Sequence, residues 1–394
     1  MTWRAAGAGA VLALLVGCTA PGAAAPGPAV PVPPAAGSPA AGSPAPAAPA
    51  PRTFSLVATG DVLLHPPLWR QAAGDGGGPM DFTAQLAGIR PAVSEADLAL
   101  CHLETPLAPA GGPYRGYPAF SAPPQVVAAL AATGFDACST ASNHSFDQGA
   151  AGIDRTLDAL DRAGIAHAGT ARSPAEAAAV RVLEVPTTAG PVRVGLLSYT
   201  FGTNGVAAPG GQTWRGNLID EARILRDAAT ARRQGAEVTV VALHWGEEYV
   251  PAPNAQQRAL APRLLASPDI DLLLGHHSHV AQPIRQIAGK WVAYGLGNLL
   301  AAHATPGDPL REGLLARFVV TLHPGGRTTT EAGYAPLLVT STAPLRVLDV
   351  AATLRAGGAP GASPARLAQA WERTTRVVEG EGAAAAGLRP LLTP

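Results

Sequence analysis

Apolar positions along the chain fall into short runs with two periodicities. Runs that are continuously apolar or alternate predict β-strands, and runs with apolar residues three or four positions apart predict helices. The strands are predicted at residues 53–64, 96–103, 135–139, 192–199, 237–244, 270–274, 291–296 and 314–322. The helices are predicted at residues 82–93, 124–133, 152–163, 220–234 and 255–266. Strands that alternate with helices in this way predict an α/β layered sandwich.

The periodic pattern weakens towards the C-terminus. Residues 364–378 still predict one surface helix, whereas the final residues look irregular. We therefore predict one main domain over residues 53–345 and a C-terminal extension over residues 346–394.

The N-terminal stretch differs in kind from the rest of the chain. One positive charge, Arg4, precedes an apolar run from Ala5 to Val16, which is too short to cross a bilayer but suits a signal peptide over residues 1–18. The residues that end this run, Leu-Val-Gly followed by Cys18, resemble a bacterial lipobox. That resemblance implies cleavage before Cys18, lipidation of its thiol, and a secreted protein anchored on the outer face of the bacterial cytoplasmic membrane. An ordinary secretory signal with an incidental cysteine is the alternative.

Residues 19–52 consist almost wholly of Ala, Pro, Gly and Ser. Such a composition buries too little apolar surface to fold and predicts a disordered linker between the anchor and the folded body. No later run is long and apolar enough to predict a transmembrane helix. The 28 basic and 28 acidic residues cancel, and no basic run occurs, which argues against a nucleic acid as the partner.

Two cysteines lie beyond the lipobox, and both fall in predicted strands. Cys101 and Cys138 would be neighbours if their strands pair. A secreted protein allows a disulfide between them, and two buried thiols are the alternative.

Polar side chains with metal-binding or catalytic chemistry lie at or just after the ends of five of the predicted strands. They are Asp61 and His65; His102 and Glu104; Asn143, His144 and Asp147; His244, Glu247 and Glu248; and His276, His277 and His279. The carboxyl ends of strands in an α/β sheet line its ligand crevice, so these residues are expected at one edge. Carboxylate and amide oxygens with imidazoles suit Zn, Mn or Fe. A carboxylate that bridges two such ions, about 3.5–4 Å apart, is the arrangement used to hydrolyse phosphoesters.

Six segments extend this pattern over residues 54–300, in the order GDVLLH, HLETPL, FDACSTASNHSFDQG, HWGEEY, GHHSHVAQP and YGLGNLL. In this order they resemble the CapA family of capsule or poly-γ-glutamate biosynthesis proteins, a branch similar to the calcineurin-like metallophosphoesterases. The resemblance implies a four-layer α/β/β/α sandwich of the metallophosphoesterase type and two divalent metal ions. The metal ligands that it implies are Asp61, Glu104, Asn143, His244, His277 and His279. Glu104 would bridge the ions, and His144 would donate a proton to the leaving oxygen.

Three further histidines remain open as ligands or as residues that orient ligands. His102 stands where the family usually has Asn, His65 is further from Asp61 than in the common Asp-x-His spacing, and His276 precedes the His-x-His pair. The residues predicted to bind substrate are Arg115, Asp147, Glu248 and Asn298. For Asn298 a purely structural role is the alternative.

Two functions fit this set of residues. One is a metal-dependent hydrolase that cleaves a phosphoester, or an amide bond in an envelope polymer such as poly-γ-glutamate. The other is a non-catalytic accessory protein that binds, tethers or helps to export such an anionic polymer, alongside envelope polymer-synthesis proteins. The complete ligand set and the adjacent proton donor favour the hydrolase, because a scaffold requires neither.

Overall fold

A computed structural model describes residues 22, 25, 27–29, 31, 50–303, 308–392 and 394. The predicted signal peptide, the predicted lipidation site Cys18 and most of the predicted linker lie outside these residues. The chain divides into two compact units, Met1–Ala47 and Ala48–Pro394. The described residues of the first unit are exposed and belong to no helix or strand.

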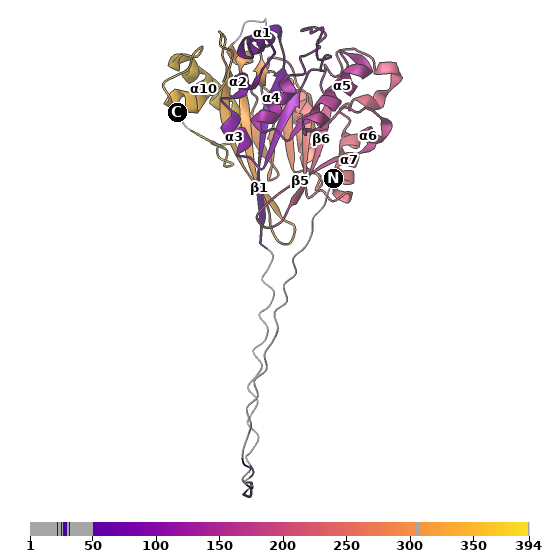
Figure 1. Ribbon diagram of the computed structural model, residues 1–394, viewed down its shortest axis with the longest axis vertical. Helices are drawn as coiled ribbons and strands as arrows, with labels where there is room; N and C mark the ends of the chain where they lie inside the picture. The colour runs from indigo at the N-terminus through magenta and orange to yellow at the C-terminus, as the bar shows by residue number, and fades with distance from the viewer. Residues whose placement is uncertain are drawn as a thin grey trace, which may run out of the picture. The chain divides into compact units, whose positions relative to one another are not determined.

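The second unit contains two β-sheets (Figure 1). The larger sheet runs in the order β14-β13-β12-β1-β2-β3-β4, with β11 beside β1 and β15 beside β13. Its strands are β1 (Arg52–Leu63), β2 (Leu98–Leu103), β3 (Ala137–Ser139), β4 (Ala166–Ala168), β11 (Asn298–Ala301), β12 (Glu312–Leu322), β13 (Thr328–Val339), β14 (Val347–Asp349) and β15 (Arg389–Pro390). Strands β1 to β4 and β11 are parallel, so their carboxyl ends share one edge.

The smaller sheet runs in the order β5-β6-β7-β8-β10-β9. Its strands are β5 (Arg181–Val185), β6 (Val192–Thr200), β7 (Val238–His244), β8 (Leu272–His276), β9 (Ile284–Ile287) and β10 (Lys290–Ala293). Strands β6, β7, β8 and β10 are parallel. The continuous burial of β7 and β8 explains why they appear as nearly continuous apolar runs in the sequence.

Helices cover the outer face of each sheet. The first group is α1 (Pro66–Asp75), α2 (Thr83–Leu86), α3 (Arg90–Ser94), α4 (Val126–Thr133) and α5 (Gly149–Arg162), which pack on the larger sheet. Helices α7 (Glu221–Arg233) and α8 (Ala255–Leu265) pack on the smaller sheet, and α6 (Pro174–Ala178) lies between β4 and β5 in sequence. Between the sheets, Leu56 and Leu100 share one core with Val240 and Leu274. The predicted α/β/β/α layering in a single main domain is therefore confirmed.

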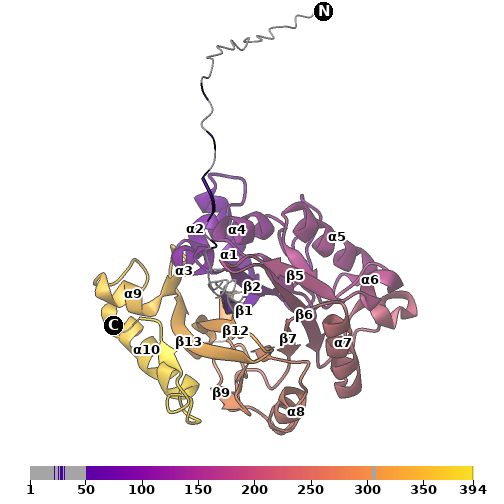
Figure 2. The same ribbon diagram turned by 90° about the horizontal axis from the view of Figure 1, so that it is seen from below.

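The C-terminal segment packs against the larger sheet. Helices α9 (Val350–Arg355) and α10 (Pro364–Val378) lie beside β13 in Figure 2, and β14 and β15 both pair with β13. The helix predicted at residues 364–378 is confirmed. Ser363 caps its N-terminus, since the Ser363 side chain accepts a hydrogen bond from the main-chain N of Arg366, and Pro364 occupies the first helical position.

The single helix predicted at residues 82–93 is wrong, because two short helices, α2 and α3, occupy this region. Gly88 separates them and packs so tightly that a Cβ would collide with the carbonyl oxygen of Val347. Pro91, near the start of α3, has no N–H to continue the hydrogen bonding of α2.

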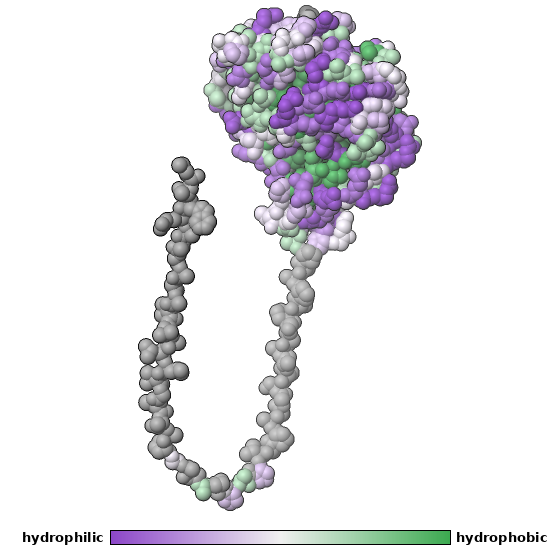
Figure 3. All heavy atoms as spheres, turned by 45° about the vertical axis from the view of Figure 1, so that its right-hand side comes forward, coloured by the Kyte–Doolittle hydropathy of each residue, from purple (hydrophilic) through white to green (hydrophobic). Residues whose placement is uncertain are grey.

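The folded unit has a largely hydrophilic surface on the face seen in Figure 3, with smaller hydrophobic areas between the polar residues. Within the described parts of the chain, no helix combines the length and the apolar character needed to cross a membrane.

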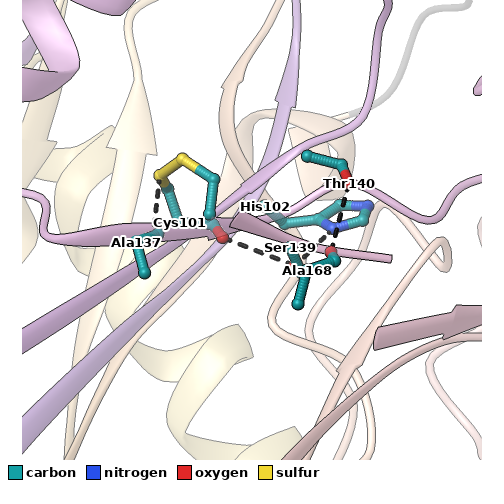
Figure 4. The surroundings of a disulfide bond; sticks show 7 residues. Cys101, His102, Ala137, Ser139, Thr140 and Ala168 are labelled. Carbon is teal, nitrogen blue, oxygen red and sulfur yellow. Dashed lines mark hydrogen bonds between the residues drawn. A yellow bond between two sulfur atoms is a disulfide. The ribbon is translucent and has the colours of Figure 1, made fainter. Parts of the chain in front are cut away.

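A disulfide joins Cys101 to Cys138, which settles the two alternatives for these cysteines. The residues face each other in register on the parallel strands β2 and β3, with Cα atoms 4.4 Å apart. The next residues along the strands, His102 and Ser139, are also paired, with His102 Nδ1 2.7 Å from Ser139 Oγ (Figure 4). The disulfide thus cross-links β2 and β3 directly below their carboxyl ends.

Replacing both cysteines by alanine is expected to lower the free energy of unfolding by about 2–4 kcal/mol, because the cross-link joins positions 37 apart and restricts the unfolded chain. Urea unfolding would measure the change. Wild-type protein unfolded with a thiol reductant should approach the stability of the double variant. If the reductant left the wild type unchanged, the disulfide would not be a source of stability.

Candidate metal centre

The carboxyl ends of strands from both sheets meet at one buried cluster of polar side chains. Strands β1, β2 and β3 lead to Asp61, Glu104 and Asn143, and strands β7 and β8 lead to His244 and the turn at residues 276–279. Asp61 Oδ1 lies 3.0 Å from Nδ1 of His276, although 215 positions separate the two residues. The strand ends converge as predicted, but they come from two sheets rather than one.

Glycines allow the main chain to pack closely beside this cluster. A Cβ on Gly60, which precedes Asp61, would collide with the carbonyl group of Gly297. The main-chain N of Asp61 donates a hydrogen bond to that same carbonyl oxygen, at 2.9 Å. Gly275, in β8, packs in the same way on the carbonyl group of Tyr294. Both strands therefore approach the cluster at a separation that only glycine permits.

Replacing Gly60 with alanine is expected to destabilise the fold by about 1–3 kcal/mol, since the new methyl group displaces main-chain atoms that cannot rotate away. The shift would also move Asp61 and weaken metal binding. Gly74 is the matched control, because it is exposed in α1 with open space around it. Alanine there should raise stability by about 0.5–1 kcal/mol. Equal effects in the two variants, measured by thermal unfolding, would contradict the packing argument.

Asp61 is held by the turn that follows β8. Its Oδ1 faces His276 Nδ1 at 3.0 Å, and its Oδ2 accepts from the main-chain N of His277 at 3.1 Å and lies 3.1 Å from His279 Nδ1. Burial opposes ionisation of this carboxyl group, but the hydrogen bonds and charges of His276 and His279 outweigh it and hold the pKa of Asp61 well below its usual range. Asp61 is therefore a carboxylate.

Glu104 lies between two parts of the cluster. Its Oε1 is 3.7 Å from Nε2 of His279 and 3.8 Å from Nε2 of His244. Both carboxyl oxygens are buried, and neither has a hydrogen-bond partner in the part of the chain that the structure describes. Burial raises the pKa of Glu104 well above its usual range, because an unpaired charge is costly in the protein interior.

Asn143 and His244 contact each other beside Glu104. Asn143 Oδ1 is 2.9 Å from His244 Nε2, and Asn143 Nδ2 donates to Oδ1 of Asn204 at 3.3 Å. The contact with Asn204 fixes the amide so that its oxygen points at the cluster. His102 contacts the other ring nitrogen of His244, since His102 Nε2 lies 3.0 Å from His244 Nδ1. Burial lowers the pKa values of both imidazoles well below the usual range, so both are neutral.

The turn after β8 presents His277 and His279 on a strained main chain. Their φ values of 86° and 54° lie in the left-handed region, which residues other than glycine rarely adopt. His277 Nδ1 is buried without a hydrogen-bond partner among the described residues, and burial lowers the pKa of His277 to about 3. Asn298, for which substrate binding or a purely structural role was predicted, places its Oδ1 3.0 Å from His279 Nδ1.

His144 and Asp147 form a pair beside the ligand cluster. His144 Nδ1 lies 2.8 Å from Asp147 Oδ2, and the ring of Phe120 packs edge-on against the imidazole at 4.7 Å. Ser142 connects the pair to the cluster, because its Oγ accepts from the main-chain N of His144 at 3.1 Å and donates to the carbonyl oxygen of Glu104 at 2.6 Å. The carboxylate of Asp147, predicted to contact substrate, thus contacts His144.

His303 is a neighbour of the cluster that we did not identify from the sequence. Its ring centroid lies 4.8 Å from that of His279 and 4.7 Å from that of His65. It follows β11 in the segment GNLLAAH, so the strand-end pattern that marked the other residues also marks this one. Burial lowers the pKa of His303 to about 2 and that of His65 to about 4, so both are neutral.

The remaining predicted residues lie nearer the surface. Glu248 is exposed, with a carboxylate oxygen within 4.8 Å of ligand atoms of His277 and His279. Arg115 is exposed, and its main chain pairs with that of Ser121.

Three groups of side chains bring their donor atoms within 4.8 Å of one another. They are Asp61, His102 and His276; Glu248, His277 and His279; and Asp61, Glu104 and His279. These groups are compatible with divalent metal binding, since carboxylate oxygens and imidazole nitrogens are the ligands such ions take. A bound cation would also satisfy polar atoms that lack a hydrogen bond. The oxygens of Glu104 and Nδ1 of His277 are buried without partners in the described chain.

Comparison with known proteins assigns the chain to a family. The bacterial capsule synthesis protein family PGA_cap matches residues 55–303, which contain all the ligand candidates named above. The chain belongs to this family. The resemblance to CapA proteins predicted from the motifs is therefore confirmed.

Curated relatives within the PGA_cap family match the chain over part of its length. The PGA biosynthesis protein CapA of Bacillus subtilis is 30% identical over 167 residues, covering 42% of each chain. The capsule biosynthesis protein CapA of Bacillus anthracis is 29% identical over 46% of this chain and 43% of that one. A probable polyglutamine synthesis accessory protein of Mycobacterium tuberculosis is 29% identical over 52% of this chain and 55% of that one. The chain spans about half the length of these relatives.

Among solved structures, the chain is similar to the calcineurin-like phosphoesterase YfkN from Bacillus subtilis, with 14% identity, a TM-score of 0.46, and coverage of 83% of this chain and 98% of that one. It is also similar to a putative 5′-nucleotidase from Staphylococcus aureus, with 15% identity, a TM-score of 0.44, and coverage of 75% and 54%.

Proposed function

We propose that this protein is a hydrolase that depends on two divalent metal ions and cleaves a phosphoester, or an amide bond of a polymer, in capsule or cell-envelope metabolism. The observation that carries the proposal is the position of Glu104, a buried carboxyl group with no partner in the described chain and with imidazoles on two sides. A bridging ligand between two cations would have these surroundings.

The residues divide into two ligand sets that share Glu104. Asp61, Glu104 and His279 would hold one ion, and Glu104, Asn143, His244 and His277 would hold the other, with Mn, Fe or Zn as candidates. When bound, such ions supply Lewis-acid polarisation of the scissile group and lower the pKa of water. His102 and Asn298 would orient His244 and His279, in the way that outer contacts orient metal-bound imidazoles.

The chain's own proton donor to the leaving group would be His144. Its Nδ1 is engaged by Asp147, so the imidazole is fixed in orientation and its Nε2 is the atom that exchanges a proton with the substrate. The carboxylate of Asp147 also accepts from the main-chain N of Phe120 at 2.7 Å, which holds it in place. Asp147 is therefore a positioning residue in this proposal.

We further propose that the enzyme works on the outer face of the cytoplasmic membrane. The support is the sequence alone: an apolar segment that ends at Cys18, followed by an Ala- and Pro-rich stretch to residue 52. A lipid on Cys18 and a tether of this composition would keep the folded unit near envelope polymers and their synthesis proteins.

Metal content is the first test. A protein comprising Ala48–Pro394, the second compact unit, would be incubated with Mn²⁺ or Zn²⁺, freed of excess ion and analysed for its elements. We expect close to two equivalents in the wild type, a loss in Asp61→Ala, and no loss in Asp269→Ala, because Asp269 precedes the amino end of β8 whereas the cluster lies at the carboxyl ends of the strands. A wild type that binds no metal under these conditions would rule out the hydrolase. Metal binding would justify a screen of phosphoesters and γ-glutamyl amides.

A non-catalytic accessory role in handling an anionic polymer is the second candidate, favoured by the description of the mycobacterial relative as a probable synthesis accessory protein. The two roles differ in their need for a proton donor. Cells that carry His144→Ala should lose the function of the protein if it is a hydrolase. They should keep it if the protein only binds and tethers polymer.

A further inference from the structure

Two exposed aromatic side chains stand against the candidate metal ligands. Phe201 is 44% exposed and Tyr249 is 43% exposed, whereas the large apolar side chains of this fold are mostly buried. Single apolar side chains at a surface need no explanation, but two that flank one polar centre do. The contacts of each residue show how it is held there.

Phe201 directly follows β6 and lies beside two of the candidate ligand histidines, His244 and His277. Its main-chain N donates to the carbonyl oxygen of His244 at 2.9 Å. Its ring centroid is 4.5 Å from that of His277. The same loop carries Asn204, which accepts from the amide of Asn143. The loop is therefore tied to three ligand candidates, while Phe201 itself stays partly exposed to solvent.

Tyr249 lies on the other side of the same turn. Its main-chain N donates to the carbonyl oxygen of Ser278 at 2.7 Å, between His277 and His279. Its φ of 68° is in the left-handed region, a conformation that a tyrosine adopts only when its surroundings impose it. Its ring centroid is 6.1 Å from that of His279. The main-chain contact to the turn thus holds an exposed aromatic ring beside the second ligand.

The two aromatic rings consequently flank one turn, with Phe201 against His277 and Tyr249 against His279, whose own ring centroids are 6.0 Å apart. Stacking on an exposed aromatic face is favourable for a ring that presents a flat apolar face, and a linear chain gains less from it because it offers no such face. We propose that Phe201 and Tyr249 form a clamp for a ring in the substrate, so that this centre acts on a phosphoester with a ring next to the scissile phosphate.

This inference rests on the proposed phosphoester hydrolysis and narrows its substrate class. It separates ring-bearing phosphoesters, such as those of pyranose sugars, from unbranched polymer chains such as poly-γ-glutamate. The two rings contribute to binding rather than to bond cleavage, so the test is a binding measurement with compounds that cannot be hydrolysed.

The test compares three phosphonates on the Mn²⁺-loaded protein by isothermal titration calorimetry: methylphosphonate, cyclohexylphosphonate and phenylphosphonate. Methylphosphonate reports on the metal centre alone. The other two add a saturated or an aromatic ring. In the wild type both ring compounds should bind about fivefold or more tightly than methylphosphonate, as expected for a stacked ring.

The variants are Phe201→Leu and Tyr249→Leu, which keep an apolar side chain but remove the ring. Val206→Ala is the control, since Val206 is exposed at 41% in the same loop as Phe201. Each Leu variant should lose most of the preference for ring compounds and keep the affinity for methylphosphonate, and the control should behave as the wild type.

The outcomes separate the clamp from the function on which it rests. A wild type that binds methylphosphonate without preferring the ring compounds would overturn the clamp and leave the phosphoester site intact. A preference that survives in both Leu variants, or an equal loss for all three phosphonates, would also overturn it. If the metal-loaded wild type bound none of the three, the proposed phosphoester function would fail together with the clamp.

Discussion

Replacing Glu104 with glutamine is expected to abolish divalent-metal binding and, at the same time, to stabilise the metal-free protein. The loss of affinity should exceed about 100-fold, because even residues that only orient ligands contribute about 10–100-fold. The gain arises because Glu104 is buried without a partner in the described chain. An amide of the same shape cannot ionise, so it avoids the cost of burying an unpaired negative charge, on the order of 1–3 kcal/mol.

The pH dependence of the stability gained by the Glu104→Gln variant follows from the direction in which burial shifts the pKa of Glu104. Burial raises the pKa of Glu104 above its ordinary value of 4.5, so the folded protein keeps this proton at pH values where the unfolded chain releases it. The contribution of Glu104 to the free energy of unfolding is therefore present below pH 4.5 and is lost as the pH rises towards the higher folded value. The advantage of the glutamine variant should grow over the same interval.

Thermal unfolding in a chelator, from pH 4 upwards, and metal titration at neutral pH would measure the two effects. Glu247→Gln is the matched control, because Glu247 is exposed and precedes the exposed Glu248. It should change neither quantity. A glutamine variant of Glu104 that still binds two metal ions would contradict the bridging role.

Replacing His144 with alanine is expected to lower the rate of phosphoester hydrolysis by about 10²–10⁴-fold while the metal content stays unchanged. The loss should be largest for alkyl leaving groups, which need a proton, and small for p-nitrophenolate, which leaves as an anion. Asp147→Asn should lose less, since it keeps the proton donor but weakens the contact that orients it.

Steady-state rates over a series of leaving groups would show this dependence, with elemental analysis of each variant alongside. His323→Ala is the control. His323 lies in the hairpin between β12 and β13, where its Nε2 is in hydrogen-bond contact with the hydroxyl of Thr329. An equal loss for all leaving groups would assign His144 to substrate binding instead of proton transfer.

The secondary structure was largely readable where periodicity and local signals agree. Strand β7 and helix α10 were predicted within a residue at each end. A nearly continuous apolar run indicates a buried strand, and a Ser-Pro pair indicates a helix start, without any information from the rest of the fold. Strand β13 was missed. Its segment TTTEAGYAPLLV contains glycine, alanine and proline, which strands disfavour, and it is held by pairing with β12 along its whole length. That pairing is tertiary information.

The sequence predicted which polar residues lie near the site better than it predicted what each of them contacts. Asp147 and Asn298 were singled out as polar residues near strand ends, and both lie at the cluster. Only the structure shows that they hold His144 and His279, because a side chain's partner depends on its direction and not on its position in a motif. His303 was overlooked because its strand is short and its segment matched no ligand in the family pattern.

The sequence by itself determined the family, most of the central strands and helices, and the residue types available to bind metal. These follow from local periodicity and from motifs whose residues are close in the chain. The tertiary structure alone decided that the strand ends of two sheets meet, that Asp61 contacts a histidine 215 positions away, and that Glu104 is left between two imidazoles without a partner in the described chain. These facts depend on how two sheets pack through their shared apolar core, and no one-dimensional pattern specifies that packing.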